Sequence, residues 1–142
     1  MVLVVFGDHK PWLGYGNSAY QELGVNLDLA SEEGFYNYYS TRYLIWANDA
    51  ARAALGGNFT GEGPDVSSCF LMNLVFDCLG WTGSAWAQAT TDIWREIPVL
   101  TDLGRYVRNG ELTAELDAEG QEVLQRYLSL QYYYSTHFQY KS

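Results

Sequence analysis

The sequence predicts an α/β fold, as the carboxy-terminal fragment of a larger sheet with flanking helices and few strands of its own. Residues 2–6 (VLVVF) form an apolar run without polar alternation, which is typical of a strand covered on both faces in a parallel sheet. Residues 43–46 (YLIW) form a second strand. Since a doubly wound sheet usually has about five strands or more, two strands among several helices indicate that the sheet is incomplete.

The helices are expected where polar caps precede apolar residues at helical spacing. A capping box of Ser18 with Gln21 begins a short helix that ends at Gly24. Residues 29–39 form a second short helix capped by Ser31, or an aromatic loop. Three longer helices are expected over residues 67–80, 84–97 and from 117 onward. Residues 56–65 form a loop, and the acids between residues 111 and 122 are read as a solvated helix start.

Length and charge limit the classes of function. The 142 residues suit a single domain over residues 1–142, and the net charge is −9. No basic stripe is present, so nucleic acid and anionic membrane surfaces are not expected partners. No apolar run reaches the roughly 20 residues that span a bilayer, and residues 1–6 lack the basic start of a signal peptide. The chain itself is therefore predicted to be soluble and without a targeting signal.

The two cysteines do not predict a disulfide or a metal site. Cys69 and Cys78 are expected on one helix, where a rise of about 1.5 Å per residue would place them about 13 Å apart. Neither belongs to a CxxC pair, so two buried free thiols are the simplest prediction. His137 lies far in sequence from any acid cluster and is assigned a surface or packing role. Asn58 begins a glycosylation sequon that no secretory signal supports.

Asp8 and His9 are the candidate site residues that the sequence singles out. They follow directly after the first strand and Gly7, where open α/β sheets place ligands. A carboxylate and an imidazole both bind divalent cations such as Mn²⁺ or Zn²⁺, but a stable site takes four donors or more. A metal site and a hydrogen-bonded Asp–His turn therefore stay equal alternatives. Residues 14–19 (GYGNSA) match the dinucleotide fingerprint only superficially, because no strand leads directly into them.

One segment resembles a known family. VVFGDHKPWLG is similar to the GDHxPxLG segment of the lipoteichoic acid synthase family, the phosphoglycerol transferases of the sulfatase and alkaline phosphatase superfamily. YYSTRYLIWAN, VSSCFLMNLVFDCLGW and LDAEGQEVLQRYLSLQYY resemble later segments of that family, in the same order, so the resemblance covers nearly the whole chain. Arg42 stands where the family usually has Pro, and Tyr133 where it often has Asp. These two departures leave the substrate open.

The resemblance implies that the chain is the carboxy-terminal portion of an alkaline-phosphatase-like catalytic domain. Asp8 and His9 would be metal ligands, typically for Mn²⁺, and Lys10 and Trp12 would lie near the substrate. The remaining ligands and a Thr nucleophile would lie upstream, in a parent protein on the extracellular face of the bacterial membrane. Its substrate would be a glycerophospholipid or a cell-envelope polymer. The isolated chain is then predicted to be inactive.

Two alternatives stay open at this stage. The first is a hydrolase of the same superfamily that cleaves sulfate or phosphate esters; Cys69 would not be its nucleophile, because the CxPxR context is absent. The second is a non-catalytic binding module that uses some of the twelve Tyr and five Trp residues to stack on sugars or on a partner.

Overall fold

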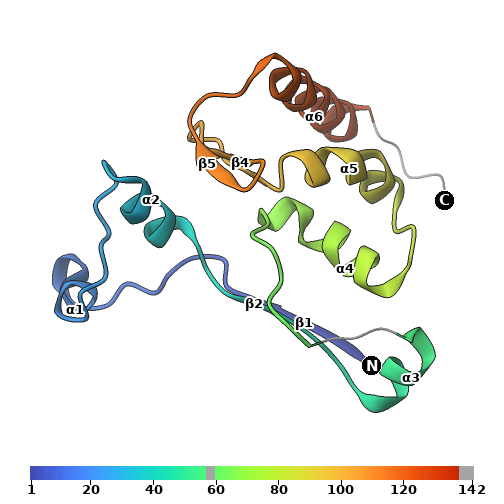
Figure 1. Cartoon of the computed structure of the whole chain (residues 1–142), viewed down its shortest axis with the longest axis horizontal. Coiled ribbons are helices and arrows are strands. Elements are labelled where there is room, and N and C mark those ends of the chain that lie inside the picture. The colour runs from blue at the N-terminus through green and yellow to red at the C-terminus, as the bar shows by residue number, and fades with distance from the viewer. Residues whose placement is uncertain (57–59, 138–142) are drawn as a thin grey trace. The chain divides into compact units, whose positions relative to one another are not determined.

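The computed structural model describes residues 1–56 and 60–137, and it comprises two compact units, Met1–Ala54 and Leu55–Ser142 (Figure 1). The fold is of the predicted mixed α/β class, with two small antiparallel sheets, one in each unit. Asn58 lies outside the described residues. None of the described helices is long and apolar enough to cross a bilayer. The assignment of both units to one domain stays a prediction.

The first unit is built on a two-stranded ribbon. Strand β1 (Val2–Phe6) and strand β2 (Tyr43–Ala47) have the predicted positions and pair with Val2 opposite Ala47. The pairing is antiparallel, so the expectation of a parallel neighbour is wrong. The expectation that residues 2–6 are buried on both faces is also wrong, because the neighbouring residues Val5 and Phe6 are 50% and 54% exposed. An apolar run shows that both faces of a strand carry apolar side chains, but it does not encode the direction of the neighbouring strand.

Short helices connect and follow these strands. They are the 3₁₀ turn η1 (Tyr15–Asn17), α1 (Ser18–Glu22), α2 (Glu32–Tyr39) and α3 (Asp49–Leu55). The capping box assigned to Ser18 is wrong, because Ser18 is the first helical residue and Asn17 precedes it with φ 61°. The helix alternative for residues 29–39 is confirmed by the Ser31 hydroxyl, which accepts a hydrogen bond from the Gly34 amide at 3.0 Å.

The second unit packs three helices side by side (Figure 1). A 3₁₀ turn η2 (Ser68–Phe70) leads into α4 (Leu71–Leu79), which is followed by α5 (Ala85–Glu96) and, at the end, α6 (Ala118–Thr136). The core lies between them, where Phe70, Ile93 and Ile97 are 0% exposed. The predicted ends are confirmed: Gly80 ends α4 in the left-handed conformation, and Ser84 and Asp117 cap α5 and α6.

A small sheet between α5 and α6 was not predicted. It consists of β3 (Val99–Leu100), β4 (Tyr106–Arg108) and β5 (Glu111–Thr113), in that order and antiparallel. Asn109 and Gly110, with φ 55° and 81°, form the two-residue turn between β4 and β5. Reading all the acids from residue 111 to residue 122 as a helix start is therefore wrong, because Glu111 belongs to a strand that this turn directs back along β4.

Arg108 connects this sheet to two helices through ion pairs. Its side chain is 10% exposed, and its guanidinium nitrogens lie 3.0 Å from the Asp117 carboxylate, 3.0 Å from that of Glu119 and 3.4 Å from that of Glu96. The hydrogen bond from the Gly120 amide, together with Arg108, lowers the pKa of the Asp117 carboxyl below its usual value. Arg108 thus joins β4 to the end of α5 and to the start of α6.

Asp117→Asn is expected to destabilise the chain at neutral pH, although asparagine also caps helices well. The substitution removes the charge that faces Arg108 and keeps the cap. A carboxyl whose pKa is lowered on folding contributes stability that is present above its unfolded-state pKa and is lost as the pH falls through its folded-state pKa. The urea midpoints of wild type and variant should therefore converge in acid. An equal difference at neutral and acid pH would show that the charge is not the cause.

Candidate metal site at the end of strand β1

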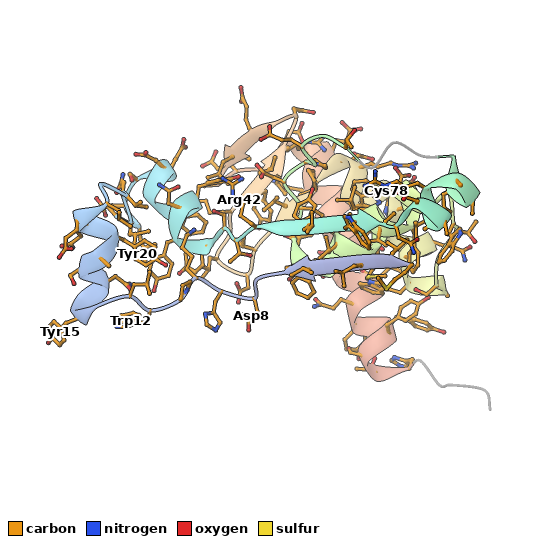
Figure 2. All side chains as sticks on the ribbon, turned by 90° about the horizontal axis from the view of Figure 1, so that it is seen from below. Asp8, Trp12, Tyr15, Tyr20, Arg42 and Cys78 are labelled. Carbon is orange, nitrogen blue, oxygen red and sulfur yellow. The ribbon has the colours of Figure 1, made fainter. Side chains whose placement is uncertain are left out.

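Asp8 and His9 lie immediately beyond β1, in a segment that the backbone holds to the start of β2. The Gly7 amide donates to the Arg42 carbonyl at 3.2 Å, and the Thr41 hydroxyl donates to the Gly7 carbonyl at 2.7 Å. A Cβ on Gly7 would lie 3.1 Å from the Cβ of Thr41, so the two backbone segments approach each other closely here. Figure 2 shows Asp8 at the point where the ribbon leaves the strand. The ladder thus fixes where the candidate pair begins.

The Asp8 and His9 side chains are neighbours and face solvent. The Asp8 carboxylate accepts a hydrogen bond from the His9 amide at 2.9 Å, and its Oδ1 lies 3.6 Å from His9 Nε2. The side chains of Asp8 and His9 are 83% and 77% exposed. The predicted Asp–His turn is therefore present, and it leaves the outer atoms of both side chains accessible.

The second imidazole nitrogen orients the ring of His9. Its Nδ1 lies 3.0 Å from the Lys10 carbonyl oxygen. Because a carbonyl oxygen only accepts hydrogen bonds, Nδ1 carries the proton in this contact. The neutral ring then presents the lone pair of Nε2, and a backbone carbonyl on the other nitrogen is the usual support for a metal-binding histidine.

The spacing of the two donor atoms fits a single cation. Two ligands about 2.1 Å from a metal ion, at a tetrahedral angle, lie about 3.4 Å apart. The distance of 3.6 Å between Asp8 Oδ1 and His9 Nε2 is close to that value. Two donors are fewer than a stable site needs, and residues 1–56 and 60–137 contain no group of three or more His, Cys, Asp or Glu placed to hold a metal ion. The pair can thus provide only part of a coordination shell.

The pair forms one wall of a cavity of about 300 Å³ inside the first unit. The four residues that the sequence assigned to metal and substrate are all among its lining residues: Asp8, His9, Lys10 and Trp12. The other lining residues are Pro11, Asn17, Tyr20, Leu27, Tyr38 and Tyr39. The Tyr20 hydroxyl donates to the Pro11 carbonyl at 2.9 Å, which ties the loop after His9 to helix α1. Figure 2 shows Trp12 and Tyr20 along this loop and helix.

Sequence reasoning missed the opposite wall of this cavity. Asn17 lies in the segment whose glycines resembled a nucleotide fingerprint, and its positive φ of 61° is seen only in the structure. Its Oδ1 is buried and has no hydrogen-bond partner among the described residues. Tyr38 and Tyr39, whose rings meet edge-on at 4.9 Å, belong to the aromatic cluster that was assigned to α2 without a role. The cavity therefore combines ionisable groups on one side with aromatic rings and an amide on the other.

The other residues considered in the sequence lie in the second unit. Cys69 and Cys78 are free, as predicted, but Cys78 is exposed, so its predicted burial is wrong. Leu71, Leu74 and Val75 are buried on α4, whereas Cys78, which shares their face by helical spacing, is exposed in the last turn of the helix. Partial burial raises the pKa of both thiols, and the neighbouring Asp77 raises that of Cys78 further. These thiols are poor nucleophiles at neutral pH.

His137 has the predicted packing role. It follows α6, and its ring stacks on Tyr133 with an interplanar angle of 4°.

Comparison with known proteins adds no relative: no protein-family model matches the chain, and no curated protein or solved structure matches it either. Any assignment of function therefore depends on the residues of the cavity and on the motif resemblance.

Proposed function

We propose that this chain is the carboxy-terminal part of a metal-dependent catalytic domain of the phosphoglycerol transferase type, within the sulfatase and alkaline phosphatase superfamily. The observation that supports it is the Asp8–His9 pair, whose donor atoms lie 3.6 Å apart on the wall of a cavity just beyond a strand. The GDHKPWLG motif that carries the resemblance contains all four of the assigned residues that line this cavity. The proposed substrate is a membrane glycerophospholipid or a cell-envelope polymer.

The residues of this chain would have separate roles in such a site. Asp8 and His9 would hold a divalent cation, and the resemblance implies that this cation is Mn²⁺ in the parent enzyme. When bound, such a cation polarises the phosphoryl group and lowers the pKa of the attacking hydroxyl. Lys10 provides a positive charge for phosphoryl oxygens. Trp12, which is 69% exposed, provides an apolar face for the alcohol portion of the substrate.

The remaining functional groups are assigned to the upstream part of the same catalytic domain. They are a Thr nucleophile and a further acid ligand, in a parent protein on the extracellular face of the bacterial membrane. A hydrolase of the same superfamily would use Asp8 and His9 in the same way. The residue at the upstream nucleophile separates the two activities, because Thr indicates transfer and a Cys in a sulfatase signature indicates sulfate ester cleavage.

A titration with Mn²⁺, followed by two-dimensional NMR, tests the metal-binding part of the proposal. Paramagnetic broadening is expected first at the amides of residues 8–10, with weak affinity, because the chain provides only two ligands. Asp8→Asn and His9→Gln should each remove this broadening.

Asp102→Asn, which replaces an exposed acid in the second unit, is the matched control and should leave the broadening unchanged. Broadening that begins elsewhere, or that persists in both Asp8→Asn and His9→Gln, would favour the reading of this segment as a simple turn.

A further inference from the structure

The second unit contains a cavity of about 350 Å³ between α4, the loop after Gly80 and α5. Its buried lining residues are Asn73, Ala87 and Trp94, and its exposed lining residues include Trp81 and Asp92. The cavity therefore extends from the surface to the packed interface of the two helices. All of its lining residues belong to the second unit, so it is separate from the Asp8–His9 cavity.

Asn73 leaves one buried acceptor unused in this cavity. The residue is 4% exposed, and its Nδ2 donates to the Ala87 carbonyl at 2.8 Å and to the Thr90 hydroxyl at 3.0 Å. Both amide protons are thereby used, whereas Oδ1 is buried and has no hydrogen-bond partner among the described residues. A buried polar atom without a partner is uncommon and calls for an explanation such as a ligand. The unused atom can only accept, so it selects a hydrogen-bond donor.

Two other polar residues of the lining, Thr91 and Asp92, also offer acceptors. Thr91 donates its hydroxyl proton to the Ala87 carbonyl at 2.8 Å, which leaves its oxygen as an acceptor. Asp92 is exposed and has no ion-pair partner within residues 60–137. The acceptors of Asn73 and Thr91 and the negative charge of Asp92 favour a cation that donates hydrogen bonds over an anionic ligand.

A cation of the protein itself already lies at the edge of this cavity. Arg95 donates to the Asp77 carboxylate at 2.9 Å, and its guanidinium lies 6.0 Å from the centre of the Trp94 ring. The Asp77 carboxylate and the face of the Trp94 ring thus both bind the positively charged guanidinium of Arg95. Asp92 and Trp81, which is 59% exposed, likewise provide a carboxylate and an aromatic ring among the lining residues of the cavity. No cation from the described residues is paired with either of them.

We propose that this cavity binds a primary ammonium group on an aliphatic stem, such as a free diamine or a lysine side chain. An ammonium has three donors and no acceptor, which suits a cavity in which Asp92, Thr91 and Asn73 are lining residues that carry acceptor oxygens. The aliphatic stem packs against the Trp81 ring at the opening. This binding role is independent of the proposed transferase activity, because no residue of the Asp8–His9 cavity takes part.

The test is an NMR titration of the full chain with cadaverine and, separately, with lysine blocked at both ends. Shifts are expected at the Trp81 indole and at the Asn73 side-chain amide. Norleucine blocked in the same way lacks only the ammonium and should bind much more weakly. Tighter binding of cadaverine identifies a free diamine as the ligand, and tighter binding of the blocked lysine identifies a protein side chain.

Two substitutions should change the affinity in opposite directions. Asp92→Asn is expected to weaken binding about fivefold, as expected for an exposed ion pair. Arg95→Gln frees the Asp77 carboxylate and is expected to strengthen binding about fivefold for the same reason. Glu122→Gln, which replaces an exposed acid on α6, is the control and should have no effect. The proposal is overturned if no ammonium ligand binds, if norleucine binds equally well, or if Asp92→Asn leaves the affinity unchanged.

Discussion

Under the proposed function, replacing Asp8 with alanine in the complete catalytic domain is expected to lower phosphoglycerol transfer by about a thousandfold. Charge stabilisation by a metal ion contributes several kcal/mol to such a reaction, and each 1.36 kcal/mol corresponds to about a factor of ten. His9→Ala should have an effect of similar size, because Asp8 Oδ1 and His9 Nε2 face the same space at 3.6 Å. The measurement is transfer from a labelled glycerophospholipid, in membranes that contain equal amounts of each variant.

The controls for this prediction come from the same unit. Glu22→Gln changes an exposed acid of α1 outside the cavity and should leave the rate unchanged. The isolated chain should not hydrolyse bis-p-nitrophenyl phosphate above background. Hydrolysis by the isolated chain that disappears in Asp8→Ala would show that it is active alone, and near-normal transfer by the complete Asp8→Ala domain would exclude Asp8 as a metal ligand.

Replacing Phe70 with alanine is expected to reduce the stability of the second unit by about 3–5 kcal/mol. The Phe70 side chain is 0% exposed and lies edge-on to the Tyr127 ring, with 5.4 Å between the ring centres. Its removal would leave a cavity where η2 meets α6, and it would also remove the aromatic contact. Urea denaturation, followed by tryptophan fluorescence, measures the change, because Trp86 lies 6.0 Å from Tyr127.

Met72→Ala is the matched control for Phe70→Ala. Met72 lies two residues further along the chain and is 49% exposed, so its truncation should cost within about 0.5 kcal/mol, as is usual for surface substitutions. Equal effects of the two substitutions would contradict the position of Phe70 in the core.

Local signals in the sequence predicted most of the helices and the first two strands, but helix α3 (Asp49–Leu55) was not predicted. Ser31, Ser84 and Asp117 each cap a helix through a side-chain bond that depends only on neighbouring residues, and Gly80 ends a helix for an equally local reason. The Asn109–Gly110 turn was a readable hairpin signal that was overlooked, because the flanking strands β4 and β5 have only three residues each.

The parts that could not be predicted depend on contacts between distant residues. Nothing in residues 2–6 encodes that β2 runs antiparallel to them. Asp8, His9, Lys10 and Trp12 were identified because they are contiguous, whereas Asn17, Tyr20 and Tyr38 reach the same cavity from other elements. The unused oxygen of Asn73 becomes visible only when α4 and α5 are packed together.

The two units also differ in how soon their structure can form during synthesis. In the second unit, strands that are consecutive in the sequence pair with one another, and each of the helices α4, α5 and α6 packs on its neighbour in the sequence. Because these contacts close only short loops, this unit can fold fast. In the first unit, β1 acquires its ladder only when residues 43–47 have left the ribosome. Until then, Asp8 and His9 follow an apolar segment, Val2–Phe6, whose backbone has no partner strand. The candidate metal ligands are thus translated before the strand that positions them, and they reach their places only after the ribbon closes.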